Sequence, residues 1–274
     1  TSIVRLFAMS DYRNANLKFW NSVVPEHVES DFYDVAGFLS GGITLDDIEM
    51  NQVGDVCGQT LLHLQCHFGL STLSWVRLGA LATGVDFSPA AIAAARRLSS
   101  ESGLSARFVE SNIYDISDNL NEHYDIVFTS YGVLCWLPDL DEWAEQIASC
   151  LKDGGRFHLV EYHPLMTALE CGPGNDVVLR NSYFNEGVET FEVKGSYASS
   201  KSFINETTYE WNHSVGEVIT ALVNAGLNID TFTEYPYATD GGFVGYLQRD
   251  EDKKWRVPDH KWGVPLTYSI CASK

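Results

Sequence analysis

The stretch that decides the fold is Leu61-Leu62-His63-Leu64-Gln65-Cys66-His67-Phe68-Gly69-Leu70-Ser71-Thr72-Leu73, followed by Thr83-Gly84-Val85-Asp86-Phe87-Ser88-Pro89. This pattern predicts a buried strand, a tight loop, a helix and a second strand that ends in an acid. Such a unit is typical of the nucleotide-binding half of a doubly wound α/β domain. Asp86 follows the loop by roughly 20 residues, the spacing at which an acid accepts hydrogen bonds from ribose hydroxyls.

The loop of this unit differs from a dinucleotide-binding loop. The G-x-G-x-x-G pattern is absent, because Gln65 and His67 stand where glycines would let the backbone approach a pyrophosphate. The sequence therefore predicts a nucleoside ligand that carries no phosphates.

The motifs that follow, taken in order, resemble those of the class I S-adenosylmethionine (SAM)-dependent methyltransferases. The resemblance is close over residues 55 to 163 and looser beyond. The matching segments are Leu62–Gly69 (first motif), Asp86 (acid after the second strand), Arg107–Asp115 (adenine side), Tyr124–Ser130 (fourth strand) and Leu151–Phe157 (turn into the fifth strand). The first motif departs from the family pattern, which is usually an acid followed by alternating glycines.

The resemblance implies a doubly wound, mostly parallel seven-stranded sheet, a Rossmann-like methyltransferase fold with an antiparallel C-terminal hairpin. We expect the SAM-binding domain to span residues 55–274. Residues 1–54 precede it, and we expect short helices and loops there that form an N-terminal cap or lid. Residues 165–210 break the α/β alternation, and we interpret them as an insertion over the site.

Capping residues, glycines and prolines predict where several helices and strands begin or end. Ser88-Pro89 predicts a helix start and Gly103 its end. Asp139 starts a further helix that we expect to end at Gly154-Gly155, and Ser214 to Glu217 is a capping box. The expected strand pairs are 191–197 with 203–209, and 227–233 with 265–272. His163-Pro164 marks the end of the fifth strand, residues 171–176 are expected to form a loop, and the charged stretch 248–260 is expected to be exposed.

Composition narrows the function classes. A hydrophobic content of 45% and a charged content of 20% are ordinary for a soluble globular protein. We find no run of 18 apolar residues, so no membrane span is expected. The net charge of −19 opposes nucleic-acid binding; it is consistent with solubility or with a salt-tolerant host. Six cysteines without a Cys-x-x-Cys pair indicate reduced thiols and a cytoplasmic protein. The oligomeric state cannot be predicted.

The resemblance also implies a cofactor site. Asp86 would bind ribose, while Gln65, Cys66, His67 and Gly69 would line the methionine part. His67 could equally be a histidine packed beside the loop. Asn112 stands where the family usually has an aspartate on the adenine amino group, and an amide oxygen can accept that bond. The remaining cofactor-binding candidates are Phe87, Ile113, Ser130 and Tyr131.

Catalytic and acceptor residues are less sharply defined. His163 is the candidate general base, because its reference pKa lies near neutrality; a hydrogen-bonded structural histidine is the alternative. Further candidates for the base are His27, His213 and Tyr33. For substrate binding we name Trp20, Tyr33 and Trp136, although these rings could be core or hydrophobic cover. His63, Cys66 and His67 do not converge as metal ligands, so no metal is expected.

The function that the resemblance implies is transfer of a methyl group from SAM to a small-molecule acceptor, on oxygen, nitrogen or sulfur. Two alternatives stay open. One is a nicotinamide-dependent oxidoreductase on a similar sheet, and the other is a SAM-binding protein without catalysis.

Overall fold

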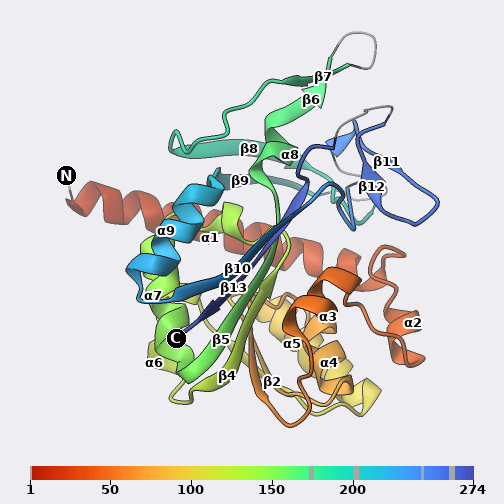
Figure 1. Cartoon of the computed structure of the whole chain (residues 1–274), viewed down its shortest axis with the longest axis vertical. Helices are drawn as coiled ribbons and strands as arrows, with labels where there is room; N and C mark the ends of the chain where they lie inside the picture. Colours follow the sequence, from red (N-terminus) through yellow and green to blue (C-terminus); the bar gives the residue numbers. More distant parts are fainter. Residues whose placement is uncertain (1, 173–175, 200–203, 242–243, 259–262) are drawn as a thin grey trace.

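The structure is a computed structural model that describes residues 2–172, 176–199, 204–241, 244–258 and 263–274 (Figure 1). Its centre is a seven-stranded sheet in the order β10-β13-β5-β4-β1-β2-β3. The strands are β1 (Thr60–Leu64), β2 (Leu81–Asp86), β3 (Arg107–Glu110), β4 (Tyr124–Ser130), β5 (Leu151–Tyr162), β10 (Asn228–Tyr235) and β13 (Thr267–Ser273). β1 to β5 are parallel, and β13 runs antiparallel to both β5 and β10. The predicted fold class is confirmed.

Helices cover both faces of the sheet. α6 (Ile116–Asn119), α7 (Leu140–Cys150) and α9 (Val215–Asn224) share one core with inward residues of β1, β4 and β5. α3 (Asp47–Val53) and α4 (Leu70–Arg77) pack on the other face, around the fully buried Trp75 and Phe128. α5 (Pro89–Ser102) lies against β2 and β3. Because these layers bury the strands on both faces, a ligand is expected at the carboxyl ends of the strands, where doubly wound folds bind their ligands.

The N-terminal segment differs from the expectation. Instead of several short helices, it forms one long helix, α1 (Ser2–Glu29), followed by the short helix α2 (Val35–Leu39). α1 crosses the carboxyl ends of the sheet strands (Figure 1). Its buried side chains recur at helical spacing, which explains its length; they are Asn16, Phe19, Val23, Val24 and His27. The Asn16 side chain donates to the Tyr209 carbonyl and accepts from the Tyr209 N–H, which ties α1 to β9.

Most helix boundaries that were predicted from the local sequence are confirmed. Ser88 caps α5 and Gly103 ends it, and Ser214 with Glu217 forms the capping box of α9. The helix after Asp139 ends at Cys150 rather than at Gly154-Gly155, because Leu151 already pairs with Tyr124 of β4. Both glycines therefore lie within β5.

The remaining strands form three two-stranded sheets. β8 (Val188–Lys194) and β9 (Asn205–Trp211) are antiparallel, as predicted, although Phe203 lies outside the described residues. The expected loop 171–176 begins at the last residue of β6 (Leu169–Cys171), which pairs with β7 (Val177–Leu179), and residues 173–175 are not described. β11 (Gln248–Arg249) and β12 (Trp255–Arg256) lie between β10 and β13, so that pair is antiparallel without being a tight hairpin.

α8 (Pro164–Ala168) follows β5 directly. Across the described ranges, no helix is both long and apolar enough to cross a lipid bilayer.

Candidate functional site

A cavity of about 1820 Å³ is lined by residues at the carboxyl ends of β1, β2, β4 and β5 and by residues of α1. The residues predicted to bind the cofactor or the acceptor and the candidate base His163 all lie in its lining: Trp20, Tyr33, Gln65, Cys66, His67, Gly69, Asp86, Phe87, Asn112, Ile113, Ser130, Tyr131, Trp136 and His163. His27, a further candidate base, does not. The cavity exceeds the range of about 300–1,000 Å³ that is usual for a single small ligand. It has room for a cofactor and an acceptor together.

The loop between β1 and α4 is held in an unusual backbone conformation. Gln65 and His67 both have φ of 51°, and Gly69 has φ of 83°. Residues other than glycine rarely adopt positive φ, and such residues cluster at functional sites. A Cβ atom at Gly69 would lie 2.7 Å from the Phe108 ring, so this glycine is required by packing as well as by its φ.

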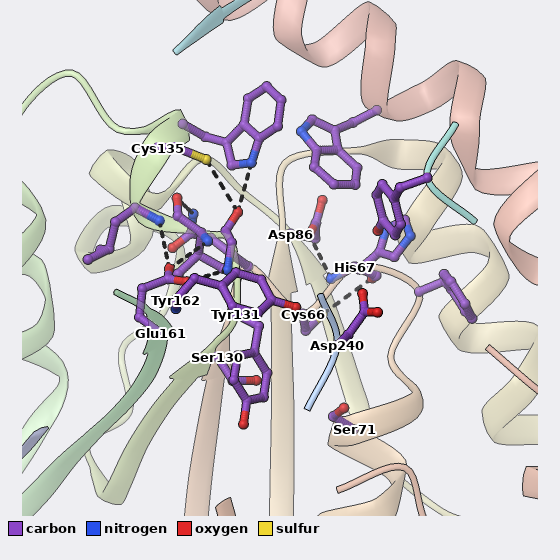
Figure 2. Close-up of a pocket in the computed structure, with 18 of the residues that line it drawn as sticks. Cys66, His67, Ser71, Asp86, Ser130, Tyr131, Cys135, Glu161, Tyr162 and Asp240 are labelled. Carbon is purple, nitrogen blue, oxygen red and sulfur yellow. Dashed lines mark hydrogen bonds between the residues drawn. The ribbon is translucent and has the colours of Figure 1, made fainter. Parts of the chain in front are cut away.

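Asp86 connects this loop to the next one. Its Oδ2 atom accepts the His67 N–H at 2.8 Å, and its Oδ1 atom accepts the Ser88 N–H at 2.9 Å. The side chain is nearly buried yet lines the cavity, as Figure 2 shows for Asp86 and His67. Burial raises the pKa of this carboxyl to about 6. An acid in this position can accept further hydrogen bonds from ligand hydroxyls.

Asn112 and Ile113 lie past the end of β3. The Asn112 Oδ1 atom accepts the Tyr114 N–H at 3.0 Å, and Ile113 is buried in the core shared with α7. The amide oxygen has a second lone pair, so the predicted contact with a ligand amino group stays geometrically open.

The segment after β4 is anchored by Glu161 at the end of β5. Its carboxylate accepts the N–H groups of Gly132, Val133, Leu134 and Tyr162. Burial raises the pKa of this carboxyl, and these four donors oppose that rise. The anchored segment in turn accepts a 3.1 Å hydrogen bond from Gln65 Nε2 to the Val133 carbonyl. Glu161 therefore links β5 to the loop after β1.

Aromatic side chains cover the loop after β1 from the side of α1. The ring centroid of Trp20 lies 5.2 Å from that of Trp136 and 5.2 Å from that of His67, in edge-to-face arrangements. The centroids of Tyr33 and His67 are 5.7 Å apart. The three predicted substrate residues thus lie in one wall of the cavity.

The histidines proposed as bases are all engaged in hydrogen bonds. His163 Nδ1 accepts the Leu165 N–H at 3.1 Å, and its Nε2 lies 3.2 Å from Glu234 Oε1, so the cap on α8 and the carboxylate use both ring nitrogens. His213 Nε2 lies 2.7 Å from the Leu137 carbonyl. His27 contacts His67 and Ser196. This bonding favours structural roles, and a catalytic role for His163 stays a prediction.

Several residues that line the cavity were not predicted from the sequence. Asp46 and Glu49 form the capping box of α3, and the Tyr131 hydroxyl donates to the Asp46 carboxylate. Asp240 and Tyr197 reach the cavity from distant loops. The Asp46-to-Glu49 spacing is a readable helix-start signal, whereas the other two have no local signal in the sequence. Among the described residues, no three His, Cys, Asp or Glu side chains gather as a metal site would need.

The chain is similar to known methyltransferases in sequence and in fold. Residues 62–157 match a family model described as a methyltransferase domain. A ubiquinone biosynthesis O-methyltransferase of Xanthomonas euvesicatoria pv. vesicatoria (strain 85-10) is 31% identical over 105 residues, which are 38% of this chain and 44% of that enzyme. This chain spans about half the length of the curated relatives that it matches first.

Solved structures share the fold over a longer range. A putative SAM-dependent methyltransferase from Listeria monocytogenes superposes with a TM-score of 0.59 at 20% identity, over 83% of this chain and 95% of that one. A glycopeptide N-methyltransferase complexed with SAM gives a TM-score of 0.55 at 17% identity, over 82% of this chain and 90% of that chain. At these identities the likeness establishes the fold.

Proposed function

We propose that the chain is a class I SAM-dependent methyltransferase, since its residues 62–157 match a methyltransferase domain, and that it transfers a methyl group from SAM to a small-molecule acceptor. The observation that carries the proposal is the geometry at Asp86. This acid ends β2, supports the loop after β1 through the His67 N–H and faces a cavity large enough for two ligands.

The residues present fit SAM. Asp86 would accept the ribose hydroxyls, and a carboxylate binds them more strongly than a neutral acceptor does. Gln65 Oε1 is a buried acceptor without a partner among the described residues, and a ligand ammonium group would satisfy it. Asn112 and Ile113 would contact the adenine amino group and face. Cys66, Gly69 and Phe87 would complete the wall, while Ser130 and Tyr131 would face the reacting end.

The bound cofactor supplies an activated methyl group, and the chain supplies position and shielding. We propose that residues 1–54 are a cap and that residues 165–210 are an insertion over the site. Contacts support this arrangement: α1 lies against β9, and the Tyr33 hydroxyl lies 2.5 Å from the Tyr197 hydroxyl. Trp20, Tyr33 and Trp136 would then hold the acceptor. Holding two reactants in near-attack geometry removes several kcal/mol from the barrier.

The acceptor is proposed to be a small molecule rather than a nucleic acid. The net charge of −19 supports this choice, because phosphates are bound by clustered Lys and Arg. The six cysteines are free, which supports the proposed cytoplasmic location.

Calorimetry with SAM and with S-adenosylhomocysteine (SAH), without added metal, tests the proposal. We expect both ligands to bind. Folded protein that takes up neither ligand would exclude the function, and binding of NADH instead would favour the oxidoreductase alternative. Transfer from labelled SAM across a panel of metabolites distinguishes an enzyme from a protein that only binds SAM.

A further inference from the structure

One end of the cavity combines tyrosine rings with carboxylates, and we call it the tyrosine–acid end. It consists of Tyr33, Asp46, Glu49, Tyr131, Tyr162, Tyr197 and Asp240. These residues come from α3, from the ends of β4 and β5, and from three loops. In Figure 2, Tyr131 and Tyr162 lie to the left, and Asp86 and Asp240 both lie to the right of them.

The tyrosines are arranged around the acids. The Tyr131 hydroxyl donates to Asp46, and the Tyr131 and Tyr162 ring centroids are 5.3 Å apart. Tyr33 and Tyr197 meet through their hydroxyls. Asp240 acts electrostatically on Tyr33, Tyr162 and Tyr197 and raises the pKa of each of these hydroxyls, although burial is the larger cause in all three cases. Acidic side chains therefore lie close to the aromatic rings at this end of the cavity.

Positive charge is scarce in the same space. Eight carboxylates occur in the described lining: Asp31, Asp34, Asp46, Glu49, Asp86, Glu161, Glu210 and Asp240. Against them the described lining has two cationic side chains, Arg13 and Arg249. Arg13 lies 3.5 Å from Asp115 outside this end, and Arg249 is exposed and donates to the Lys253 carbonyl. Both arginines are therefore engaged elsewhere, and the described lining supplies no cationic side chain to the tyrosine–acid end.

The carboxyl of Glu49 is affected by this lack of neighbouring cations. Its side chain is 2% exposed, and burial followed by the neighbouring charge of Asp46 raises the pKa of its carboxyl to about 8. A ligand cation in the cavity would oppose this rise in the pKa, because it would stabilise the ionised form.

We propose that the tyrosine–acid end binds the acceptor as a cationic amine and that methylation occurs on nitrogen. Aromatic faces attract cations through the ring quadrupole, and desolvation strengthens that attraction. Anionic acceptors would be repelled by the same carboxylates. The inference rests on the proposed methyltransferase function and names its substrate class.

Methyl transfer to an amine agrees with a site whose candidate histidine bases are engaged in hydrogen bonds. The bound ammonium first loses one proton to solvent. The nitrogen lone pair then forms the new N–C bond while the S–C bond breaks, and that electron pair stays on the sulfur of SAH. The positive charge moves from sulfur to nitrogen, so the product ammonium forms among the carboxylates. A neutral amine needs no base during transfer, which agrees with the engaged ring nitrogens of His163.

Choline and its neutral carbon isostere, 3,3-dimethyl-1-butanol, test the cation site directly by calorimetry, with SAH and without it. They share size and shape and differ in charge. We expect choline to bind at least about tenfold more tightly, the factor expected when one good cation–π or ionic contact is lost. Equal affinities, or no choline binding, would overturn the proposal. If SAH binds and choline does not, the inference fails while the proposed function stands. If choline binds and SAH does not, the cation site stands, but the proposed function fails and methylation on nitrogen fails with it.

Matched variants locate the site. Asp46→Asn removes a charge and Glu49→Gln removes the carboxyl that a bound cation would ionise, while both keep residues that suit the capping box. Asp240→Asn removes charge in the facing loop. We expect each to weaken choline binding about tenfold, as for one lost charged contact, without changing the ratio of SAM to SAH affinity. Asp153→Asn, exposed at the opposite end of β5, is the control and should leave both unchanged. Variants that change the SAM to SAH ratio and spare choline binding would assign the acids to the sulfonium instead.

Discussion

The Nδ1 atom of His27 on α1 lies 2.9 Å from the Nε2 atom of His67 in the loop after β1. The other nitrogen of His27 lies 2.7 Å from the Ser196 hydroxyl. One imidazole must donate and the other accept, so the contact requires at least one neutral ring. It joins the N-terminal helix, the loop supported by Asp86 and the loop after β8 through side chains that sequence reasoning treated separately.

Acid should weaken this contact. Burial lowers the pKa of His27 to about 4, whereas an unfolded histidine titrates near 6.5. Between these values the unfolded chain binds more protons than the folded one, so the free energy of unfolding falls as the pH falls. The slope is about 1.4 kcal/mol per pH unit for each such histidine. Urea unfolding at pH 7 and pH 5 should show a smaller loss for His27→Gln than for the wild type. His123→Gln, at an exposed position, is the control and should keep the wild-type slope; the same slope in His27→Gln would contradict the prediction.

Asp86→Asn should weaken SAH binding by about 1.5–3 kcal/mol, the value of hydrogen bonds to a charged group. Because burial raises the pKa of Asp86 to about 6, the wild type should also lose affinity as the pH falls through 6. A ligand that donates to the carboxylate binds its ionised form, which disappears below that pH. Calorimetric titrations from pH 7.5 to pH 5 measure both effects. If Asp86→Asn binds SAH as tightly as the wild type does, Asp86 does not bind the ribose.

Glu161→Gln should destabilise the protein although it keeps the shape of the side chain. The carboxylate accepts two N–H groups on each oxygen, so an amide would place its own donors against one of these pairs. Leaving buried donors unsatisfied costs about 1–3 kcal/mol. Chemical denaturation should show this loss, together with weaker SAH binding because the segment held by Glu161 also holds Gln65. The exposed Glu186→Gln should be neutral. A Glu161→Gln protein as stable as the wild type would show that the clamp contributes little.

The sequence predicts the sheet well where local chemistry determines it. The Ser88 cap, the Gly103 stop and the acid that ends β2 each involve residues within a few positions of one another. The length of α1 was not predicted, because Pro25 lies inside it and normally indicates a break. The buried polar residues Asn16 and His27 also interrupt its apolar stripe.

The residues proposed to bind the cofactor could also be named from the sequence, and they all line one cavity. Most residues of the tyrosine–acid end could not. The contact of Tyr131 with Asp46 and the approach of Asp240 to Tyr162 join segments far apart in the chain. Pairings of this kind depend on how loops return over the sheet, and no local pattern encodes them.

The last prediction concerns the cap. Residues 12–38 include the buried side of α1 and the aromatic residues Trp20 and Tyr33, which contact the His67 ring. If this segment closes over the cofactor, SAH should slow its amide hydrogen exchange, because ligand contacts would lower the population of open states. Hydrogen exchange with and without SAH measures this directly. Protection around Gly69 and Asp86 without protection over residues 12–38 would show that the segment is passive cover. The variant Trp20→Ala distinguishes a lid that contacts the ligand from indirect stabilisation of the segment. If the segment is a lid, the variant should lose the protection of residues 12–38 and keep the protection around Asp86. If the stabilisation is indirect, the variant should keep the wild-type protection in both places.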